Sequence, residues 1–507
     1  MRRSTGERMP TRRRVRAAAS PCGLPLQSQT YAARRIDANS GSLGVNVALE
    51  SRRPPHRRAL DWTRHHFAIV VMCGVFAVLR MVSVLGVRIS TYPDSASYFD
   101  LRLWQPFRLW TTPLVYSFGF SRDHLVALQV VVAVVAWVSA AMLIARAFRS
   151  QVAQAAATVG VLVLGLTTQV SNFDSAILSE SLTLSLTVVL VALALNVVYR
   201  SSTRLMWAVG VVAFLWAFSR QSNVYILWLA TSAAVLAALL HRRRGHFVVL
   251  ACVLGAIALS GTVVSSSNTA IQTDNLGQVI ARRIAPDATL RSWWRHQGMP
   301  VLPPGVPSAA KRDTENASDP LIYEQTQRLK DDKLFWRWLS NHGAPAYLHF
   351  LVTHPHYVLT VVFSERRLLN SFLSEGVPYG TPEQVLPSFL ERVFWPETSG
   401  GALLIISASL MVCFAVIASR RRRATDVAAP PTLKSALRYS NVLLAISIAA
   451  IFFIAHTAGA EFERLLLIPA VSARIAAVIA VAALIDYTGF LKTHATTSTT
   501  PNTQNAA

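Results

Sequence analysis

Long apolar runs alternate with short polar segments from residue 67 to residue 487. A helix needs about 20 apolar residues to cross the hydrocarbon core of a bilayer. We read spans of roughly this kind at residues 67–87, 124–146, 152–170, 178–198, 205–219, 222–240, 246–264, 400–418, 441–457 and 465–487. The pattern therefore predicts an all-α polytopic membrane protein with about ten transmembrane helices.

Arginine clusters follow alternate spans, which predicts how the chain is oriented. The clusters are Arg57, Arg58 and Arg64; Arg146 and Arg149; Arg200 and Arg204; Arg242 to Arg244; and Arg420 to Arg423. With ten spans they all fall on one face, and basic loops mark the cytoplasmic side. We therefore expect a multi-pass plasma-membrane protein with both termini in the cytoplasm.

Composition agrees with a membrane protein and excludes an ordinary soluble enzyme. The chain is 52% hydrophobic and 15% charged, whereas soluble domains carry about 25% charged residues. The net charge of +23 lies mainly in the N-terminal tail and in short loops. This placement reflects membrane topology, so no nucleic-acid partner is expected. Three of the four cysteines lie in apolar runs and no CxxC occurs, so neither a disulfide framework nor a zinc site is suggested.

Changes in composition predict five segments. They are a disordered Arg-rich cytoplasmic tail (1–64), transmembrane helices one to seven (65–264), an extracytoplasmic membrane-apposed region (265–398), helices eight to ten (399–489) and a disordered tail (490–507). Residues 346–363 are apolar enough to cross but contain His354-Pro355-His356. We interpret them as an interfacial or re-entrant helix, because a crossing there would place the 420–423 cluster outside.

The first polar cluster of the outer face follows the first span, in Tyr-Pro-Asp94-Ser-Ala-Ser-Tyr98. Ionisable groups near membrane depth are functional candidates by default. Asp94 is such a candidate, and its alternative role is to cap the next helix. That helix is predicted to lie flat in the interface, with Tyr98, Leu101, Trp104 and Phe107 on it.

Two further clusters occupy the next outer loops. Asp174 and Glu180 flank the start of the fourth span, where a carboxylate also satisfies a helix N-terminus. Arg220 lies in the turn between the fifth and sixth spans. An outer arginine breaks the charge rule, so it either snorkels to the interface or binds a phosphate bidentately.

The fourth cluster precedes the last span in the segment His-Thr-Ala-Gly-Ala-Glu-Phe-Glu-Arg. It brings His456, Glu461 and Arg464 to the outer face. Glu461 and Arg464 are neighbours if the segment is helical, so a plain structural ion pair is the alternative interpretation.

These four clusters together resemble the GT-C superfamily of integral membrane glycosyltransferases, of the protein O-mannosyltransferase or lipid A aminoarabinose transferase type. The resemblance implies that a polyprenyl-phosphate-linked sugar is transferred, with inversion, to an acceptor hydroxyl on the outer face. It implies that Asp94 is the general base, and that Glu180 or Asp174 positions the acceptor or assists with a metal. The remaining implied roles are phosphate binding by Arg220, Arg464, Arg366 and Arg367, and positioning by Tyr98, Glu461 and His456.

One departure leaves the acceptor open. The protein mannosyltransferases typically have an Asp-Glu pair in the first loop, where this chain has Asp94-Ser95. A glycan, a lipid and a protein therefore all stay candidate acceptors, beside membrane lipids as partners. No cofactor is identified, and metal dependence is left open.

Three other functions compete with a glycosyltransferase. They are a secondary transporter, a lipid-linked polysaccharide polymerase or ligase, and a non-catalytic scaffold. A transporter predicts charged or broken helices at the bilayer midplane, whereas the charges here lie at the outer ends of the spans.

Overall fold

The computed structural model divides the chain into two units, Met1–His65 and His66–Ala507, and all described residues belong to the second. They are residues 67–92, 94–102, 108–200, 202–240, 244–267, 269–303, 305–306, 319–373, 384–396 and 431–497. The predicted tail 1–64 and the predicted span 400–418 lie outside them. Within these ranges the chain forms helices and turns, with one isolated parallel bridge between Ser90 and Ala176.

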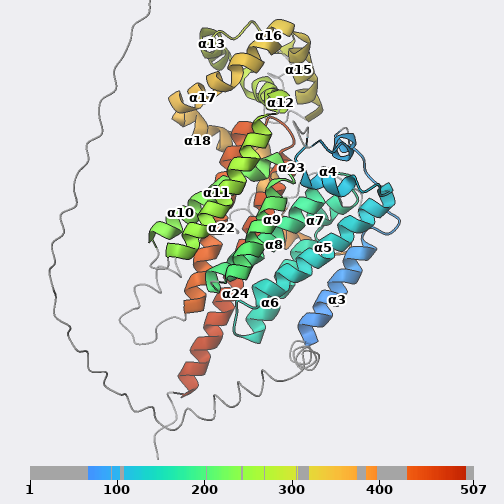
Figure 1. Cartoon of the computed structure of the whole chain (residues 1–507), viewed down its shortest axis with the longest axis vertical. Helices are drawn as coiled ribbons and strands as arrows, with labels where there is room; N and C mark the ends of the chain where they lie inside the picture. The colour runs from blue at the N-terminus through green and yellow to red at the C-terminus, as the bar shows by residue number, and fades with distance from the viewer. Residues whose placement is uncertain are drawn as a thin grey trace, which may run out of the picture. The chain divides into compact units, whose positions relative to one another are not determined.

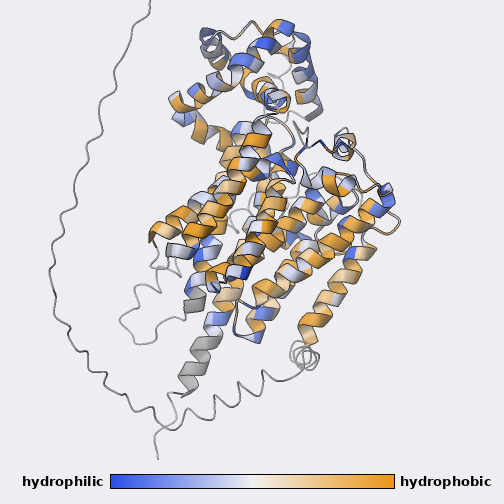
Figure 2. Cartoon of the chain, viewed as in Figure 1, coloured by the Kyte–Doolittle hydropathy of each residue, from blue (hydrophilic) through white to orange (hydrophobic). Residues whose placement is uncertain are grey.

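Six of the described helices are long and apolar enough to cross a membrane. They are α5 (Arg122–Ala145), α8 (Glu180–Tyr199), α10 (Gln221–Leu240), α11 (Arg244–Ser266), α22 (Pro431–Thr457) and α24 (Leu467–Thr497). Figure 2 shows that these helices are predominantly hydrophobic where they are coloured by hydropathy. The predicted all-α, multi-pass membrane class is therefore confirmed.

The predicted number of about ten spans is not supported. Helices α3 (Phe67–Val82) and α9 (Thr203–Ala217) have 16 and 15 residues, which at 1.5 Å per residue is shorter than the hydrocarbon core of about 30 Å. Helix α6 (Gln151–Leu166) bends by 57° into the segment Thr168–Asp174, and the pair counts as a seventh span only if it is taken as one.

The long helices share one apolar core. Helix α5 packs against α6 and α8, and α24 packs against α6 and α22. Trp137 of α5 is fully buried at the centre of this packing. Helix α6 approaches it through Gly165, where a Cβ would lie 2.7 Å from the Trp137 ring. The C-terminal helix continues to Thr497, so residues 490–497 of the predicted disordered tail are helical. The helix has one proline, Pro469 in its first turn, and none from there to Thr497.

A group of shorter helices gathers beyond one end of α11 and α22 (Figure 1). They are α12 (Thr269–Val279), the π-helical turn η4 (Ile280–Ile284), α13 (Ala288–His296), α15 (Asp319–Asp331), α16 (Lys333–Trp338), the π-helical turn η5 (Leu339–Gly343), α17 (Ala344–Thr353) and α18 (Pro355–Ser364). Their buried side chains, including Trp294, Phe335 and Phe350, form a second core. Residues 279–350 therefore have a core of their own.

Two more helices of the segment 265–398 pack against the core of the long helices. Helix α19 (Arg366–Leu373) contributes the buried Leu368 and Phe372, whereas α20 (Ser388–Phe394) packs the partly buried Leu390 and Phe394 against the core and is followed by the buried Trp395. Arg474, buried in α24, donates to the carbonyl oxygens of Phe394 and Phe372 at 2.7 and 3.1 Å. The carbonyl end of a helix attracts a cation, so this arginine fixes α19 and α20 against the span.

Residues 346–363 form two helices rather than one. Helices α17 and α18 have 10 residues each and are separated at His354, with Pro355 at the first position of α18. Ten residues rise about 15 Å, so neither helix crosses a bilayer. Proline disfavours helical geometry in the residue before it, which explains the break.

Candidate functional site

The loop after α3 holds Asp94 at the end of the bundle where α8 (Glu180–Tyr199) begins, since Arg464 contacts both Asp94 and Glu180. The Oγ of Ser95 donates to the Ile177 carbonyl oxygen at 2.8 Å and accepts from the Tyr92 backbone amide at 2.8 Å. Together with the Ser90–Ala176 bridge, these bonds fix the first outer loop against the second. The sequence Ser95-Ala-Ser-Tyr-Phe99 then forms a short 3-10 turn, η2.

The structure differs from the interfacial helix predicted after Asp94. Asp100 is extended, with φ −99° and ψ 90°, and ends the turn, and residues 103–107 lie outside the described ranges. Tyr98 is 2% exposed, because its hydroxyl contacts Asp94 and its ring packs edge-on against Tyr116. It therefore points into the protein rather than into the interface.

The side chain of Asp94 is paired with two arginines and does not cap the turn. Its Oδ2 lies 2.9 Å from a guanidinium nitrogen of Arg108 and 2.9 Å from one of Arg464. The Tyr98 hydroxyl is 3.5 Å from the same oxygen. The contacts with Arg108, Arg464 and the Tyr98 hydroxyl all fall on Oδ2 of Asp94.

Glu180, the first residue of α8, is almost completely buried. Its Oε1 is 2.9 Å from a guanidinium nitrogen of Arg220 and also accepts from Nε of Arg464. The Ser179 hydroxyl donates to the other oxygen at 3.4 Å. A role for Glu180 restricted to the helix N-terminus does not explain these contacts, because two arginines converge on its carboxylate.

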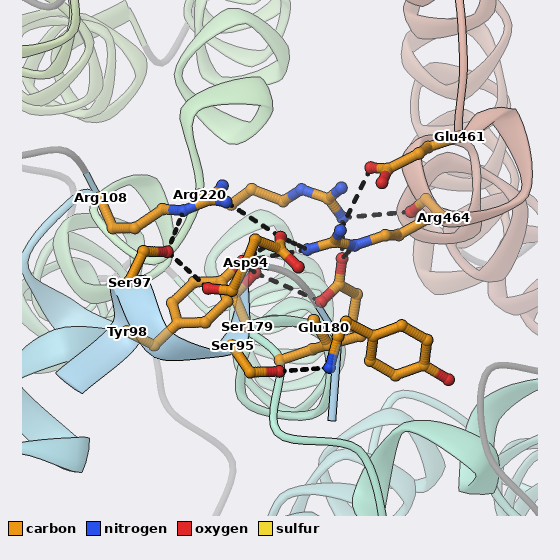
Figure 3. Close-up of polar contacts among 12 residues, drawn as sticks. Asp94, Ser95, Ser97, Tyr98, Arg108, Ser179, Glu180, Arg220, Glu461 and Arg464 are labelled. Atoms are coloured by element: carbon orange, nitrogen blue, oxygen red, sulfur yellow. Dashed lines mark hydrogen bonds and ion pairs between the residues drawn. The ribbon is translucent and has the colours of Figure 1, made fainter. Parts of the chain in front are cut away.

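Arg464 joins three carboxylates (Figure 3). It lies in α23 (Phe462–Leu465) and contacts Asp94, Glu180 and, at 3.2 Å, Glu461. It also donates to the Tyr98 hydroxyl at 3.0 Å, and its own carbonyl oxygen accepts from Arg220 at 3.1 Å. Four segments that are distant in sequence therefore meet at this one residue, three of them at its guanidinium group.

Glu461 adopts a strained backbone conformation beside this arginine. Its φ of 57° and ψ of 35° are left-handed, and no other non-glycine residue of the described ranges has a positive φ. Such strain persists where surrounding contacts impose it, often at functional sites. One carboxylate oxygen bonds Arg464 and the other accepts from the Tyr323 hydroxyl at 2.7 Å.

The cluster balances three carboxylates against three arginines, and this sets the charge state of Asp94. The carboxylates are Asp94, Glu180 and Glu461, and the arginines are Arg108, Arg220 and Arg464. Burial disfavours the charged form of Asp94, but Arg464 and Arg108 outweigh it and hold the pKa of Asp94 below its ordinary value. Asp94 is therefore an anion at neutral pH.

Asp174 is not part of this cluster. Its Oδ2 accepts from Nε of Arg80 in α3 at 2.7 Å, and its Oδ1 accepts from the Ser181 hydroxyl at 2.6 Å. Both side chains of the ion pair are 1% exposed or less. This geometry is that of a buried structural pair that joins α3 to the second outer loop.

Replacing Arg80 with alanine is expected to destabilise the protein by about 3–5 kcal/mol, because it leaves the buried Asp174 carboxylate without its cation. The measurement is the midpoint of thermal unfolding in detergent. The double change Arg80→Met with Asp174→Leu removes both charges and is expected to recover much of the loss. A single variant as stable as the wild type would show that the pair contributes nothing.

One other predicted site residue, His456, has different neighbours. His456 contacts the Tyr347 hydroxyl at 3.4 Å and the Val358 carbonyl oxygen at 3.0 Å, so it packs against α17 and α18 rather than facing Asp94. The side chains of Arg366 and Arg367 lie outside the described part of the chain. Their roles in phosphate binding stay predictions.

One residue of the cluster was not assigned a role from the sequence. Arg108 lies 14 positions after Asp94 and bonds it directly, while its Nε donates to the Ser97 hydroxyl at 2.9 Å. The sequence feature that could have identified Arg108 is the one that identified Arg220. An arginine in a loop predicted to be outside departs from the positive-inside pattern.

The fit of a divalent metal to this site is poor. Asp94, Glu180 and Glu461 are each bonded by arginine. Among the described residues, no group of three or more His, Cys, Asp or Glu side chains is arranged to hold a metal ion. The mechanism below therefore includes no step through a metal.

Comparisons with known proteins do not identify the family. No family model matches the chain, and no curated protein matches its sequence. Among solved structures, the chain is similar to the archaeal oligosaccharyltransferase AglB from Archaeoglobus fulgidus, solved with an inhibitory peptide and a dolichol-phosphate, at a TM-score of 0.40 and 13% identity. The match covers 87% of this chain but 53% of that protein, so this chain spans about half the length of AglB.

Proposed function

We propose that the protein is a glycosyltransferase that moves a sugar from a polyprenyl-phosphate-linked donor to an acceptor hydroxyl at the outer face of the plasma membrane. The observation that supports this most is the convergence of Arg108, Arg220 and Arg464 on Asp94 and Glu180 at one end of an apolar helix bundle. A charged site at the end of apolar helices suits a substrate with an ionic headgroup and a lipid tail.

In the proposed reaction, Asp94 acts as the general base. The acceptor oxygen attacks the anomeric carbon while its proton passes to Oδ1 of Asp94. The bond between the anomeric carbon and the phosphate oxygen breaks, and its electron pair stays on the phosphate. Attack on the face opposite the leaving group inverts the anomeric centre.

The arginines stabilise the leaving group. A sugar phosphodiester carries one negative charge, whereas the released polyprenyl phosphate carries up to two. Cations placed where charge develops lower the barrier, because they bind the transition state more strongly than the ground state. Arg220 and Arg464 are proposed for this role, because each already holds the buried Glu180 carboxylate.

Donor binding is also expected to make Asp94 a better base. A phosphate that attracts Arg464 weakens the interaction of that arginine with Asp94, and the pKa of Asp94 then rises from its depressed value. Glu180 stays buried and keeps the arginines oriented. Tyr98, which contacts Asp94, and Glu461, which contacts Arg464, are proposed to position the acceptor.

The depressed pKa of Asp94 gives a pH prediction. A lowered pKa means that the carboxylate stays ionised as the pH falls, so kcat/KM is expected to be level from pH 7 to about pH 5, with its acid limb below the ordinary aspartate value of about 3.9. Because kcat reports the donor complex, its acid limb is expected at higher pH. Coincident limbs for kcat and kcat/KM would contradict the proposed release of Arg464 from Asp94.

The test of the reaction class is transfer of radiolabelled sugar from a panel of polyprenyl-phosphate donors in membranes that contain the full chain. Product formation that depends on the protein supports a transferase. Transport or flipping of the same donors without product would instead support a secondary transporter. Product that consists only of extended polysaccharide would support a polymerase or ligase.

A topology measurement tests the placement of the site. Reporter domains fused after Pro300 are expected to lie outside the cytoplasm, because residues 265–364 belong to the same end of the bundle as Asp94 in the proposed orientation. A reporter that is active in the cytoplasm would place the site on the wrong face for a flipped lipid-linked donor.

A further inference from the structure

A second buried charge cluster lies beside the proposed site. Arg282 and Arg283, in the π-helical turn η4, both pair with Glu365, which follows α18. Nε of Arg282 is 2.8 Å from Oε1 of Glu365, and a terminal nitrogen of Arg283 is 2.5 Å from Oε2. The side chains of the two arginines are 2% and 5% exposed. One carboxylate therefore neutralises part of the charge of two buried guanidinium groups.

Both arginines also hold the segment 455–462, which connects α22 to α23. Arg282 donates to the Gly459 carbonyl oxygen at 3.2 Å, and Arg283 donates to the Ala455 carbonyl oxygen. The ring of Phe462 lies under both guanidinium groups, at 4.8 and 5.8 Å from ring centroid to Cζ. This segment therefore depends on η4 for its position.

The backbones are equally close at this point. A Cβ on Gly459 would lie 2.4 Å from the carbonyl oxygen of Gln278, at the end of α12. Backbone atoms cannot yield as a flexible side chain can, so glycine is required for this approach. The strained Glu461 follows two residues later, and Arg464 three residues after that.

We propose that Glu365 is a positioning residue for Arg464 and couples the outer helices to the catalytic site. The proposal rests on the proposed function, because it assigns Arg464 a role in transfer. Glu365 aligns Arg282 and Arg283, these fix residues 455–462, and that segment delivers Arg464 to Asp94 and Glu180. Without the Glu365 charge, two buried arginines repel each other and release the segment.

The test is Glu365→Gln in the full chain, which keeps the shape of the side chain but removes its charge. Misplacement of a catalytic group by about 1 Å costs on the order of 100-fold in rate, so kcat is expected to fall about 10- to 100-fold. The acid limb of kcat/KM is expected to move to higher pH, because Asp94 loses part of its interaction with Arg464. A purely structural role would lower the yield of folded protein and leave that limb in place.

Glu324→Gln is the matched control. Glu324 also belongs to the outer helices and pairs with an arginine, Arg328, at 2.8 Å, but that pair is exposed. This variant is expected to keep the wild-type kcat and pH profile. Glu365→Asp restores the charge and is expected to recover part of the rate. An unshifted acid limb in Glu365→Gln would overturn the proposal.

Two further measurements keep the proposal decidable. If Glu365→Gln does not fold, Gly459→Ala displaces the same segment through its clash with Gln278 and is expected to shift the acid limb in the same direction.

Hydrogen exchange of residues 455–465 does not depend on activity. Faster exchange in Glu365→Gln, but not in Glu324→Gln, is expected. If the wild type transfers no sugar, the proposed function fails, while unchanged exchange would overturn the coupling itself.

Discussion

Asp94→Asn is expected to reduce sugar transfer by about 10²- to 10⁴-fold, the usual contribution of a general base. Asparagine keeps the size of the side chain and accepts hydrogen bonds from Arg108 and Arg464, but it does not take a proton at neutral pH. Folding and insertion are expected to persist, because Asp94 lies in a loop and is 21% exposed. The measurement is the initial rate of transfer per amount of folded protein in membranes.

Asp100→Asn is the matched control for this change. Asp100 belongs to the same outer loop and pairs with Arg102 at 2.8 Å, but both side chains are well exposed. Its loss is expected to leave transfer unchanged. Wild-type activity in Asp94→Asn would refute the assignment of the base, whatever the control shows.

Replacing Arg464 with glutamine is expected to have the second large effect, a fall in kcat of about 10²- to 10³-fold, as for the loss of one group that stabilises developing charge. Arg464 contacts Asp94, Glu180 and Glu461 through different guanidinium nitrogens. Lysine offers a single point charge without this fork, so Arg464→Lys is expected to restore little of the rate. Full activity in the lysine variant would show that charge alone is sufficient.

The two variants are expected to differ in lipid binding. Asp94→Asn keeps the arginines and is expected to bind polyprenyl phosphate as the wild type does or more tightly, because a competing anion is removed. Arg464→Gln is expected to bind it more weakly. Arg102→Gln, which removes an exposed arginine from the same face, is the control for general charge. Equal binding by Asp94→Asn and Arg464→Gln would contradict a phosphate-binding role for Arg464.

The positions of the helices along the chain were predicted well from the local pattern of apolar and polar residues. Nine of the ten predicted apolar runs coincide with helices of the structure, from Phe67–Val82 to Leu467–Thr497. The remaining run, 400–418, lies outside the described residues. Apolar periodicity and length are properties of each segment alone, so they are readable without a fold. The number of helices that cross a membrane is harder to predict from the sequence, because α3 and α9 are short and α6 is bent.

The candidate residues of the site were proposed from their positions, but their partners were not, except for the pair of Glu461 with Arg464. Asp94, Glu180, Arg220 and Arg464 stood out as ionisable groups at the outer ends of apolar helices. Asp174 has the same signature, yet it pairs with Arg80 inside the bundle. Sequence spacing cannot separate these cases, because Arg464 and Glu180 are 284 positions apart and meet only through helix packing.

The sequence by itself determined the all-α membrane class and the polar clusters at the ends of the apolar runs, because these depend on hydrophobicity and charge along the chain. Tertiary structure alone decided that residues 361–373 and 384–395 contribute to the core of the bundle, that Arg474 fixes α19 and α20, and that Arg282, Arg283 and Glu365 meet. Burial and pairing of charges depend on long-range packing, and a buried charge is stable only when that packing supplies its partner.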